Sequence, residues 1–252
     1  MKIIFIAGTA GSGKSTLVTR IKEHYTKSGS FPAILNLDPG VEDTLYAPDI
    51  DIRDHIDVVS LMRQHKLGPN GALVMASDLV ASKLDVIQNE SNTINPDYLI
   101  VDTPGQIELF AYRNSGPYII ENLEAEEKVG IFMYDGKLIT NPTNFVSISM
   151  LATSVRLRLG MSMINVLSKQ DLITDMIDEI IKWSSNLPAL ENAIASSTDG
   201  ESYSLVSNVL RGLNLGGLSQ GLIPISSVTG TGMINLEMAL SRIINLGEEI
   251  ED

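Results

Sequence analysis

The chain has 252 residues, of which 44% are hydrophobic, and its 18 basic and 31 acidic side chains give a formal charge of −13. This length and apolar content predict a sizeable core in one or two domains, while the acidic surface disfavours nucleic acid and anionic membranes as partners. Because the chain has no cysteine and no apolar run as long as a membrane span, we expect a cytoplasmic protein without disulfides, thiol nucleophiles or thiolate metal sites.

Apolar runs alternate with helical periodicity along the whole chain. Runs typical of strands buried on both faces occupy residues 2–7, 33–37, 98–102, 129–134, 163–168 and 222–226. Amphipathic periodicity predicts helices at residues 15–27, 55–66, 72–88, 106–123, 142–158, 174–185, 202–211 and 232–246. The alternation predicts an α/β fold, a three-layer α/β/α sandwich with a mostly parallel central sheet. We expect one domain over residues 1–252, with a helical insertion at about 174–221.

Residues Gly8–Ser15 (GTAGSGKS) match the phosphate-loop pattern G-x-x-x-x-G-K-[ST] without a mismatch. They join the first apolar run to the first helix, so their glycines let backbone N–H groups converge on phosphate oxygens at a helix N-terminus. Lys14 is expected to reach the β- and γ-phosphates, and the Ser15 hydroxyl to ligate Mg²⁺. The pattern predicts a P-loop NTPase whose nucleotide contacts in this segment are Gly11, Ser12, Gly13, Lys14, Ser15 and Thr16.

A D-x-x-G motif at residues 102–106 (DTPGQ) comes at the end of the third apolar run. In a GTPase switch of this kind, Asp102 holds Mg²⁺ through a water molecule and the Gly105 N–H senses the γ-phosphate. Gln106 occupies a position from which a glutamine orients the attacking water. We therefore expect this switch motif to lie beside the phosphate loop.

Residues 168–171 (SKQD) follow another apolar run and match the N/T/S-K-x-D pattern of guanine-binding GTPases. A carboxylate at Asp171 would accept from N1–H and the exocyclic amine of guanine, a pair of donors that adenine lacks. The stem of Lys169 would lie along the base. Ser226 and Ser227 end a later apolar run, where a backbone N–H is expected to contact the guanine carbonyl. GTP and GDP are therefore the expected ligands.

Three further motifs are NLDP at residues 36–39, DIRD at 51–54 and LGPNG at 67–71. Together with the phosphate loop, DTPGQIE and SKQD, they make the chain resemble the GPN-loop GTPases. This is a P-loop family of the signal-recognition and MinD-type class, and the likeness is to a single-domain, archaeal-like member. It covers residues 2 to about 246. Its marker is Gly68-Pro69-Asn70, which we place in a loop between two helices.

The resemblance implies a homodimer in which the GPN loop of one subunit approaches the nucleotide of the other, so Asn70 would act in trans. Asp38 matches a family position near the attacking water and Mg²⁺, which it would bind through water. Glu108 matches a further family position. Gln106, Asp38, Glu108 and Asn70 are thus the catalytic candidates, and which of the first three orients the water is left open.

The DIRD segment matches a family signature to which we assign switch ordering. An additional role is open to Asp54, as the N-cap of a helix beginning at residue 55. Thr9 stands where MinD-type relatives carry a signature lysine. No arginine finger is assigned either, so we expect modest hydrolysis.

The predicted function is a homodimeric, Mg²⁺-dependent GTPase switch that assists assembly of a protein complex, by resemblance RNA polymerase. The client protein itself is not identified. A P-loop kinase is one alternative, but residues 104–130 offer only Arg113 and Lys128 for a basic lid. A nucleotide-dependent scaffold with negligible turnover is the other, against which Gln106 and Asn70 argue.

Overall fold

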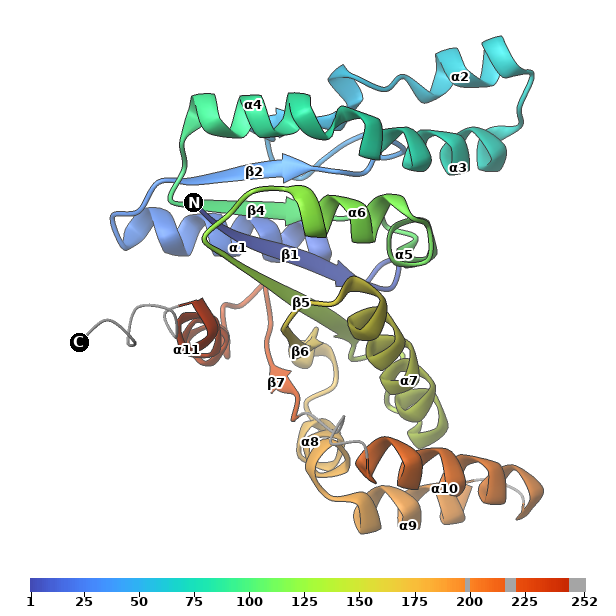
Figure 1. Ribbon diagram of the computed structural model, residues 1–252. Coiled ribbons are helices and arrows are strands. Elements are labelled where there is room, and N and C mark those ends of the chain that lie inside the picture. The colour runs from blue at the N-terminus through green and yellow to red at the C-terminus, as the bar shows by residue number, and fades with distance from the viewer. Residues whose placement is uncertain (198–199, 216–220, 245–252) are drawn as a thin grey trace.

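The computed structural model describes residues 1–197, 200–215 and 221–244, and its centre is a seven-stranded sheet in the order β3-β2-β4-β1-β5-β6-β7 (Figure 1). The strands are β1 (Lys2–Gly8), β2 (Pro32–Asn36), β3 (Ile50–Asp51), β4 (Tyr98–Asp102), β5 (Glu127–Asp135), β6 (Met163–Ser168) and β7 (Ile223–Pro224). Every pairing among them is parallel, and Lys2 of β1 lies opposite Tyr98 and Glu127. The carboxyl ends of the strands therefore share one edge of the sheet.

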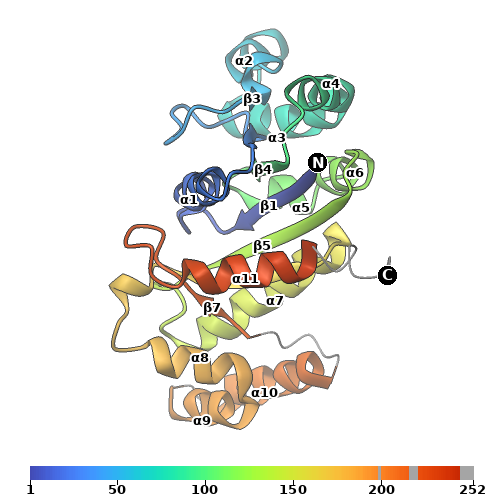
Figure 2. The same cartoon turned by 90° about the vertical axis from the view of Figure 1, so that its left-hand side faces the viewer.

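Helices cover both faces of this sheet, as Figure 2 shows. One face is covered by α1 (Lys14–Lys27) and α11 (Met233–Ile244), and the other by α3 (Pro69–Val80), α4 (Leu84–Ile94), α5 (Ile107–Ala111), α6 (Ser115–Asn122) and α7 (Pro142–Leu159). Side chains alternate along β1, so Ile4 and Ile6 pack in one layer of the core, whereas Ile3 and Phe5 pack in the other. This three-layer arrangement confirms the predicted fold class.

The remaining helices lie outside these two layers. They are α2 (Val58–His65), which packs on α3, and α8 (Ile177–Ser185), α9 (Leu187–Ser197) and α10 (Gly200–Leu215) beyond the β7 edge of the sheet. The helix α9 was not predicted, because its Ser and Asn content resembles a loop. It forms because Leu190 and Ile194, four residues apart, are both buried. None of the described helices has the length and apolar character needed to cross a bilayer.

Two helices predicted as continuous are interrupted. The predicted helix 106–123 is α5 and α6, because Pro117 has no N–H to donate to the Arg113 carbonyl. Gly116 permits the tight packing at this break, since a Cβ there would lie 2.1 Å from the Phe110 carbonyl oxygen. The predicted helix 72–88 begins earlier, at Pro69, and is interrupted by the 3₁₀ turn η2 (Ala81–Lys83). The two-residue strand β3 was not predicted, since it is too short to show alternation.

Candidate nucleotide-binding site

The phosphate loop, residues Gly8–Ser15, connects the central strand β1 to α1. Gly8, Gly11 and Gly13 adopt φ values of 152°, 75° and 95°, which only glycine adopts readily. Gly13 is the N-cap of α1, so the first N–H groups of that helix are directed into the loop. The ammonium of Lys14 donates to the carbonyls of Gly8 and Thr9, both at 3.1 Å. The loop thus curls around this ammonium, as the pattern predicts.

Lys14 and Asp102 are two buried side chains of opposite charge at the carboxyl end of the sheet. Burial lowers the pKa of Lys14, and the charges of Asp102 and Asp38 counteract that shift. Burial also raises the pKa of Asp102, which accepts hydrogen bonds on Oδ2 from Tyr46 Oη at 2.7 Å and from Ser15 Oγ at 2.8 Å. Because little water screens these charges, they interact strongly with a charged ligand.

The residues around Asp102 fit a bound Mg²⁺. A hydroxyl oxygen and a carboxylate oxygen lie 2.8 Å apart here, on Ser15 and Asp102, and hard oxygen ligands of this type suit Mg²⁺. Within the described residues, no group of three or more His, Asp or Glu side chains is arranged to hold a metal. Proteins usually bind nucleotide-associated Mg²⁺ through one or two side chains, with phosphates and water completing the shell.

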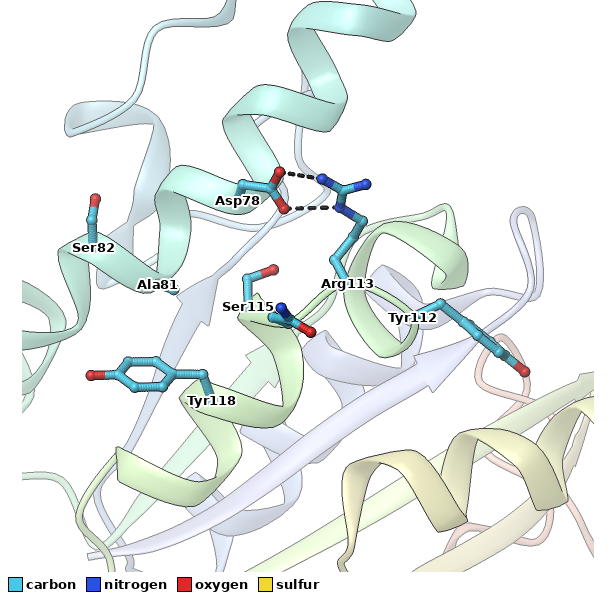
Figure 3. Close-up of a pocket in the computed structure, with 8 residues that line it drawn as sticks. Asp78, Ala81, Ser82, Tyr112, Arg113, Ser115 and Tyr118 are labelled. Carbon is cyan, nitrogen blue, oxygen red and sulfur yellow. Dashed lines mark hydrogen bonds and ion pairs between the residues drawn. The ribbon is translucent and has the colours of Figure 1, made fainter.

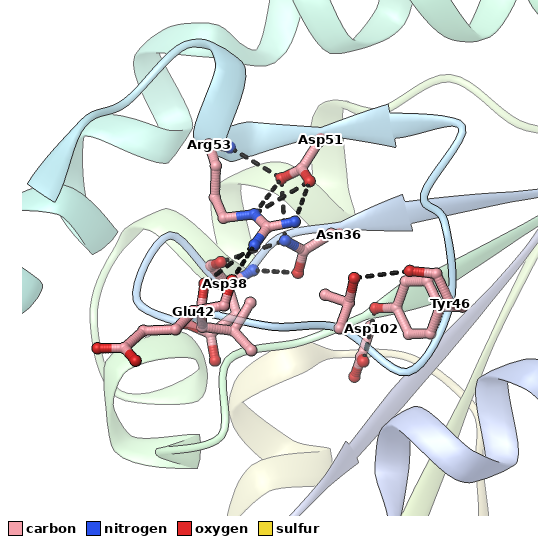
Figure 4. Close-up of polar contacts among 9 residues, drawn as sticks. Asn36, Asp38, Glu42, Tyr46, Asp51, Arg53 and Asp102 are labelled. Atoms are coloured by element: carbon pink, nitrogen blue, oxygen red, sulfur yellow. Dashed lines mark hydrogen bonds and ion pairs between the residues drawn. The ribbon is translucent and has the colours of Figure 1, made fainter.

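Asp38 lies in the segment after β2, beside Asn36 and near the pair of Arg53 and Asp51 (Figure 4), and it contacts the switch motif. Its Oδ2 accepts from the Gly105 N–H at 3.0 Å, and its Oδ1 accepts from the Gly40 N–H at 2.9 Å. Asn36, at the end of β2, accepts from the Asp38 N–H at 3.0 Å and donates to Asp51 at 3.0 Å. The Gly105 N–H, which we expected to contact a γ-phosphate, therefore binds the Asp38 carboxylate in this structure.

Arg53 anchors the same segment from the DIRD motif. Its guanidinium forms a bidentate pair with Asp51 and donates to the carbonyls of Val41, at 3.2 Å, and Glu42, at 2.8 Å. Burial opposes ionisation of Asp51, yet hydrogen bonds from Arg53 and Asn36 outweigh it and hold the pKa of this carboxyl below its ordinary value. Arg53 thus fixes the backbone that follows Asp38.

The predicted capping role of Asp54 is wrong. The helix α2 begins at Val58, and its N-cap is Asp57, whose carboxylate accepts from the N–H groups of Val59 and Ser60. Asp54 instead lies in the short 3₁₀ turn η1 (Ile52–Asp54), which Asp51 caps. Asp57 was overlooked because the apolar periodicity begins before the helix does.

The guanine motif, residues 168–171, packs against the phosphate loop. Lys169 donates to the Gly11 carbonyl at 2.6 Å and to Asp135, at the end of β5, at 2.7 Å. Ser168 Oγ donates toward the carbonyl of Ser12 at 2.8 Å. Asp171 lies in the 3₁₀ turn η3 (Gln170–Leu172), and its carboxylate has no hydrogen-bond partner in the described part of the chain.

The segment that follows β7 is hydrogen-bonded to the guanine motif, which follows the neighbouring strand β6. The Gln170 N–H donates to the Ile225 carbonyl at 3.1 Å, directly before Ser226 and Ser227. The cleft beside the phosphate loop measures about 290 Å³, and its lining includes Gly11, Gly13, Lys14, Ser15, Thr16, Asn36, Asp38, Asp102 and Gly105. Phosphate, switch and guanine motifs are thus brought to one edge of the sheet, as parallel topology requires.

The other catalytic candidates lie near or outside this cleft. Gln106 is the exposed N-cap of α5, and Glu108 is exposed in the first turn of that helix. The GPN tripeptide is the start of a helix, which corrects its placement in a loop: Gly68 caps α3 and Pro69 is in its first turn. Gly68 has a φ of −73°, so the conformational freedom of glycine is not used there. Asn70 is exposed and does not line the cleft of its own chain.

Two residues near the nucleotide motifs were not predicted. Tyr46 gives no signal in the sequence, because its contact with Asp102 depends on how the segment after β2 folds back. Asp135 is a carboxylate directly after an apolar run, and that position is itself a signal, since polar residues at strand ends gather at this edge.

A larger hollow, of about 790 Å³, lies between α3 and α6 (Figure 3). It contains an ion pair in which Arg113 binds Asp78 through both carboxylate oxygens.

Lys128 donates to the carbonyls of Ile120, at 2.6 Å, and Glu121, at 3.3 Å. Arg113 and Lys128 are the two basic residues available for a kinase lid, and each already binds other groups of the chain: Arg113 binds a carboxylate, and Lys128 binds backbone carbonyls.

Comparisons with known proteins agree with this architecture. A family model described as a conserved hypothetical ATP binding protein matches residues 6–246. GPN-loop GTPase 1 of Dictyostelium discoideum is 34% identical over 84% of this chain, which spans about half (52%) of that relative's length. GPN-loop GTPase 1 of Schizosaccharomyces pombe is 30% identical over 98% of this chain and 70% of its own length.

A solved structure is similar over nearly its whole length. The crystal structure of a GTPase in apo form from Pyrococcus abyssi matches with a TM-score of 0.85 and 26% sequence identity. The match covers 96% of this chain and 97% of that one. The chain therefore belongs to the GPN-loop GTPases, a family of P-loop GTP hydrolases.

Proposed function

We propose that the protein is a cytoplasmic, Mg²⁺-dependent molecular switch that hydrolyses GTP to GDP and phosphate. The observation that carries this proposal is the contact of Lys169 with the Gly11 carbonyl, at 2.6 Å, which joins the guanine motif to the phosphate loop. By resemblance, the switch would assist assembly of a protein complex such as RNA polymerase.

Guanine is favoured over adenine by the groups beside this contact. The matching family model is described by ATP binding, whereas the relatives are named GTPases. Asp171 offers a carboxylate without a partner among the described residues, two positions after Lys169, which contacts the phosphate loop. A carboxylate in this position suits the N–H donors of guanine and repels the acceptor N1 of adenine.

We assign hydrolysis to the residues of the switch motif, at the carboxyl end of β4, together with Asp38. Gln106 is exposed directly after Gly105, whose N–H contacts Asp38, so these two side chains flank the region where an attacking water would be held. Bound Mg²⁺ would neutralise charge on the phosphate oxygens. We propose Gln106 as the residue that orients the water and Asp38 as its supporting acceptor.

Purified protein is expected to release phosphate from GTP, and not from ATP, only when Mg²⁺ is present. The discrimination should be on the order of 10⁴, as for sites that hydrogen-bond a substrate N–H. The measurement is phosphate release from each nucleotide with Mg²⁺ or EDTA, with Lys14→Ala protein as a control for contaminating phosphatases. Transfer of the γ-phosphate to an added acceptor would instead support a kinase, and binding without release would support a scaffold.

We further propose that two chains form a homodimer in which Asn70 reaches the partner's nucleotide. Support comes from its exposure in the first turn of α3, a helix that also packs on the Asp38 segment: a Cβ on Gly40 would lie 2.3 Å from the Leu73 side chain. The first turns of α3 thus pack against the segment that carries Asp38, while Asn70 itself is exposed.

Asn70→Ala and Gln106→Ala are each expected to slow hydrolysis at least about tenfold without weakening GTP binding, because both contacts form at the reacting phosphate. Mixing the two variants should restore activity, since one site of each mixed dimer then carries neither substitution. Turnover of the mixture, after subunit exchange is verified, is the measurement. If it stays as low as that of the separate variants, Asn70 acts within its own chain.

A further inference from the structure

Arg20, on the helix that follows the phosphate loop, holds the segment that ends the guanine site. Its Nε donates to the Ser227 carbonyl at 2.6 Å, and its Nη2 donates to the Val228 carbonyl at 2.9 Å. Its remaining Nη1 pairs with Glu23 at 3.0 Å. The guanidinium therefore joins α1 to residues 227–228, which lie more than two hundred positions away in the sequence.

The rest of this turn is held by its own hydrogen bonds. Ser226 donates its N–H to the Thr231 carbonyl at 2.9 Å and accepts from Gly230 at 2.8 Å, while its hydroxyl accepts from the Thr229 N–H at 3.1 Å. The N–H groups of Ser227 and Val228 have no partner in the described part of the chain, although Ser227 is only 9% exposed. A buried N–H without a partner, such as that of Ser227, is rare unless a ligand or water accepts from it. Val228 is 70% exposed, so its N–H is open to solvent or to a ligand.

Peptide geometry fixes the direction of one of these donors. The carbonyl of Ser227 and the N–H of Val228 belong to the same planar trans peptide and point in opposite directions. Because Arg20 holds that carbonyl against α1, the Val228 N–H is directed away from α1. The turn is also bound to the guanine motif through Gln170 and Ile225, at 3.1 Å. The Val228 N–H thus points away from α1, on a turn that is attached to the segment containing Asp171.

We infer that Arg20 is a positioning residue for base selectivity, which aims the backbone N–H groups of residues 227–228 at the 6-oxo group of guanine. The inference rests on the proposed guanine site. Since α1 also carries Lys14 and Ser15, one rigid helix sets the distance between the phosphate end and the base end. A planar guanidinium holds two neighbouring carbonyls at once, which a lysine ammonium does less well.

The test compares GTP with 2-aminopurine riboside triphosphate, whose base lacks the 6-oxo group. Arg20→Met keeps the stem of the side chain and removes its donors, so it should weaken GTP binding about three- to tenfold, the effect of one neutral hydrogen bond. Binding of the 2-aminopurine nucleotide should change less than about twofold, because that base has no acceptor for the misdirected N–H groups. Arg20→Lys should give an intermediate loss for GTP alone.

Glu23→Gln is the matched control, because it removes the ion pair with Arg20 and leaves both carbonyl contacts in place. It should leave both affinities unchanged. Equal losses for the two nucleotides in Arg20→Met and Arg20→Lys, or no loss for either, would overturn the role of Arg20. Unmodified protein that binds ATP as tightly as GTP would overturn the guanine site itself.

Discussion

Replacing Asp171 with asparagine is expected to weaken GTP binding by about 10²- to 10⁴-fold and to favour xanthosine triphosphate instead. A hydrogen bond to a charged group contributes about 1.5–3 kcal/mol, and the exocyclic amine of guanine would lose one. That amine would then be left unpaired, which costs about 1–3 kcal/mol more, while the bond to N1–H would lose its charge assistance. The side-chain amide of the variant places an NH₂ group opposite the exocyclic amine of guanine, so two donors face each other and no hydrogen bond forms. Xanthine carries a carbonyl at that position, so the amide amine of the variant then has an acceptor.

The measurement is the dissociation constant of each nucleotide for both proteins. Asp175→Asn is the control, because Asp175 is an exposed carboxylate just beyond the guanine motif, and its removal changes net charge by the same amount. A variant that retains full GTP affinity would remove Asp171 from the site and leave the preference for guanine without an explanation in this chain.

Lys14→Ala is expected to lower nucleotide affinity about ten- to hundredfold while the protein remains folded. The ammonium donates only to two loop carbonyls, so its removal leaves the packing of β1 and α1 in place. Burial lowers the pKa of Lys14, so the variant is also relieved of a charge that is costly to bury. Loss of one charge-assisted contact to phosphate accounts for the expected factor.

Thermal unfolding with and without GTP distinguishes binding from folding. Unmodified protein gains about 2.7 kcal/mol of stability when GTP is present at 100 times its dissociation constant, and the variant should gain far less at the same concentration. Lys27→Ala, at the last turn of the same helix, should behave as unmodified protein. An undiminished gain in Lys14→Ala would contradict the phosphate-loop assignment.

The sheet was predictable from the sequence because its strands are buried on both faces and therefore form continuous apolar runs, as in β1 and β5. The helical boundaries were less predictable. Pro69 is compatible with the first turn of a helix, where no N–H is needed, yet proline and two glycines together also indicate a loop. Pro117 also lacks an N–H, but it lies in the interior of the predicted helix 106–123, where that N–H would be needed. The helix is therefore interrupted before it.

The site was predictable where its residues lie within short motifs at strand ends, as with Lys14, Asp102 and Lys169. It was not predictable where contacts join distant segments. Tyr46 reaches Asp102 across 56 positions, and Arg20 reaches Ser227 across 207. No periodicity or motif records such pairs, since they depend on how the segment after β2 and the turn after β7 pack on the finished sheet.

The position of β1 in the sheet affects how the chain folds during synthesis. This strand precedes both of its neighbours in the chain, since these are β4 and β5, and the second of them begins only at Glu127. Until then, the backbone N–H and C=O groups along one edge of β1 have no partner, and such non-local parallel pairing is slow and exposed to aggregation. A nascent chain ending before Glu127 contains the whole phosphate loop but lacks the strand on which Gly8 packs. The nucleotide site is thus completed only after β5 has been made, and until then the growing chain is exposed to association with its neighbours.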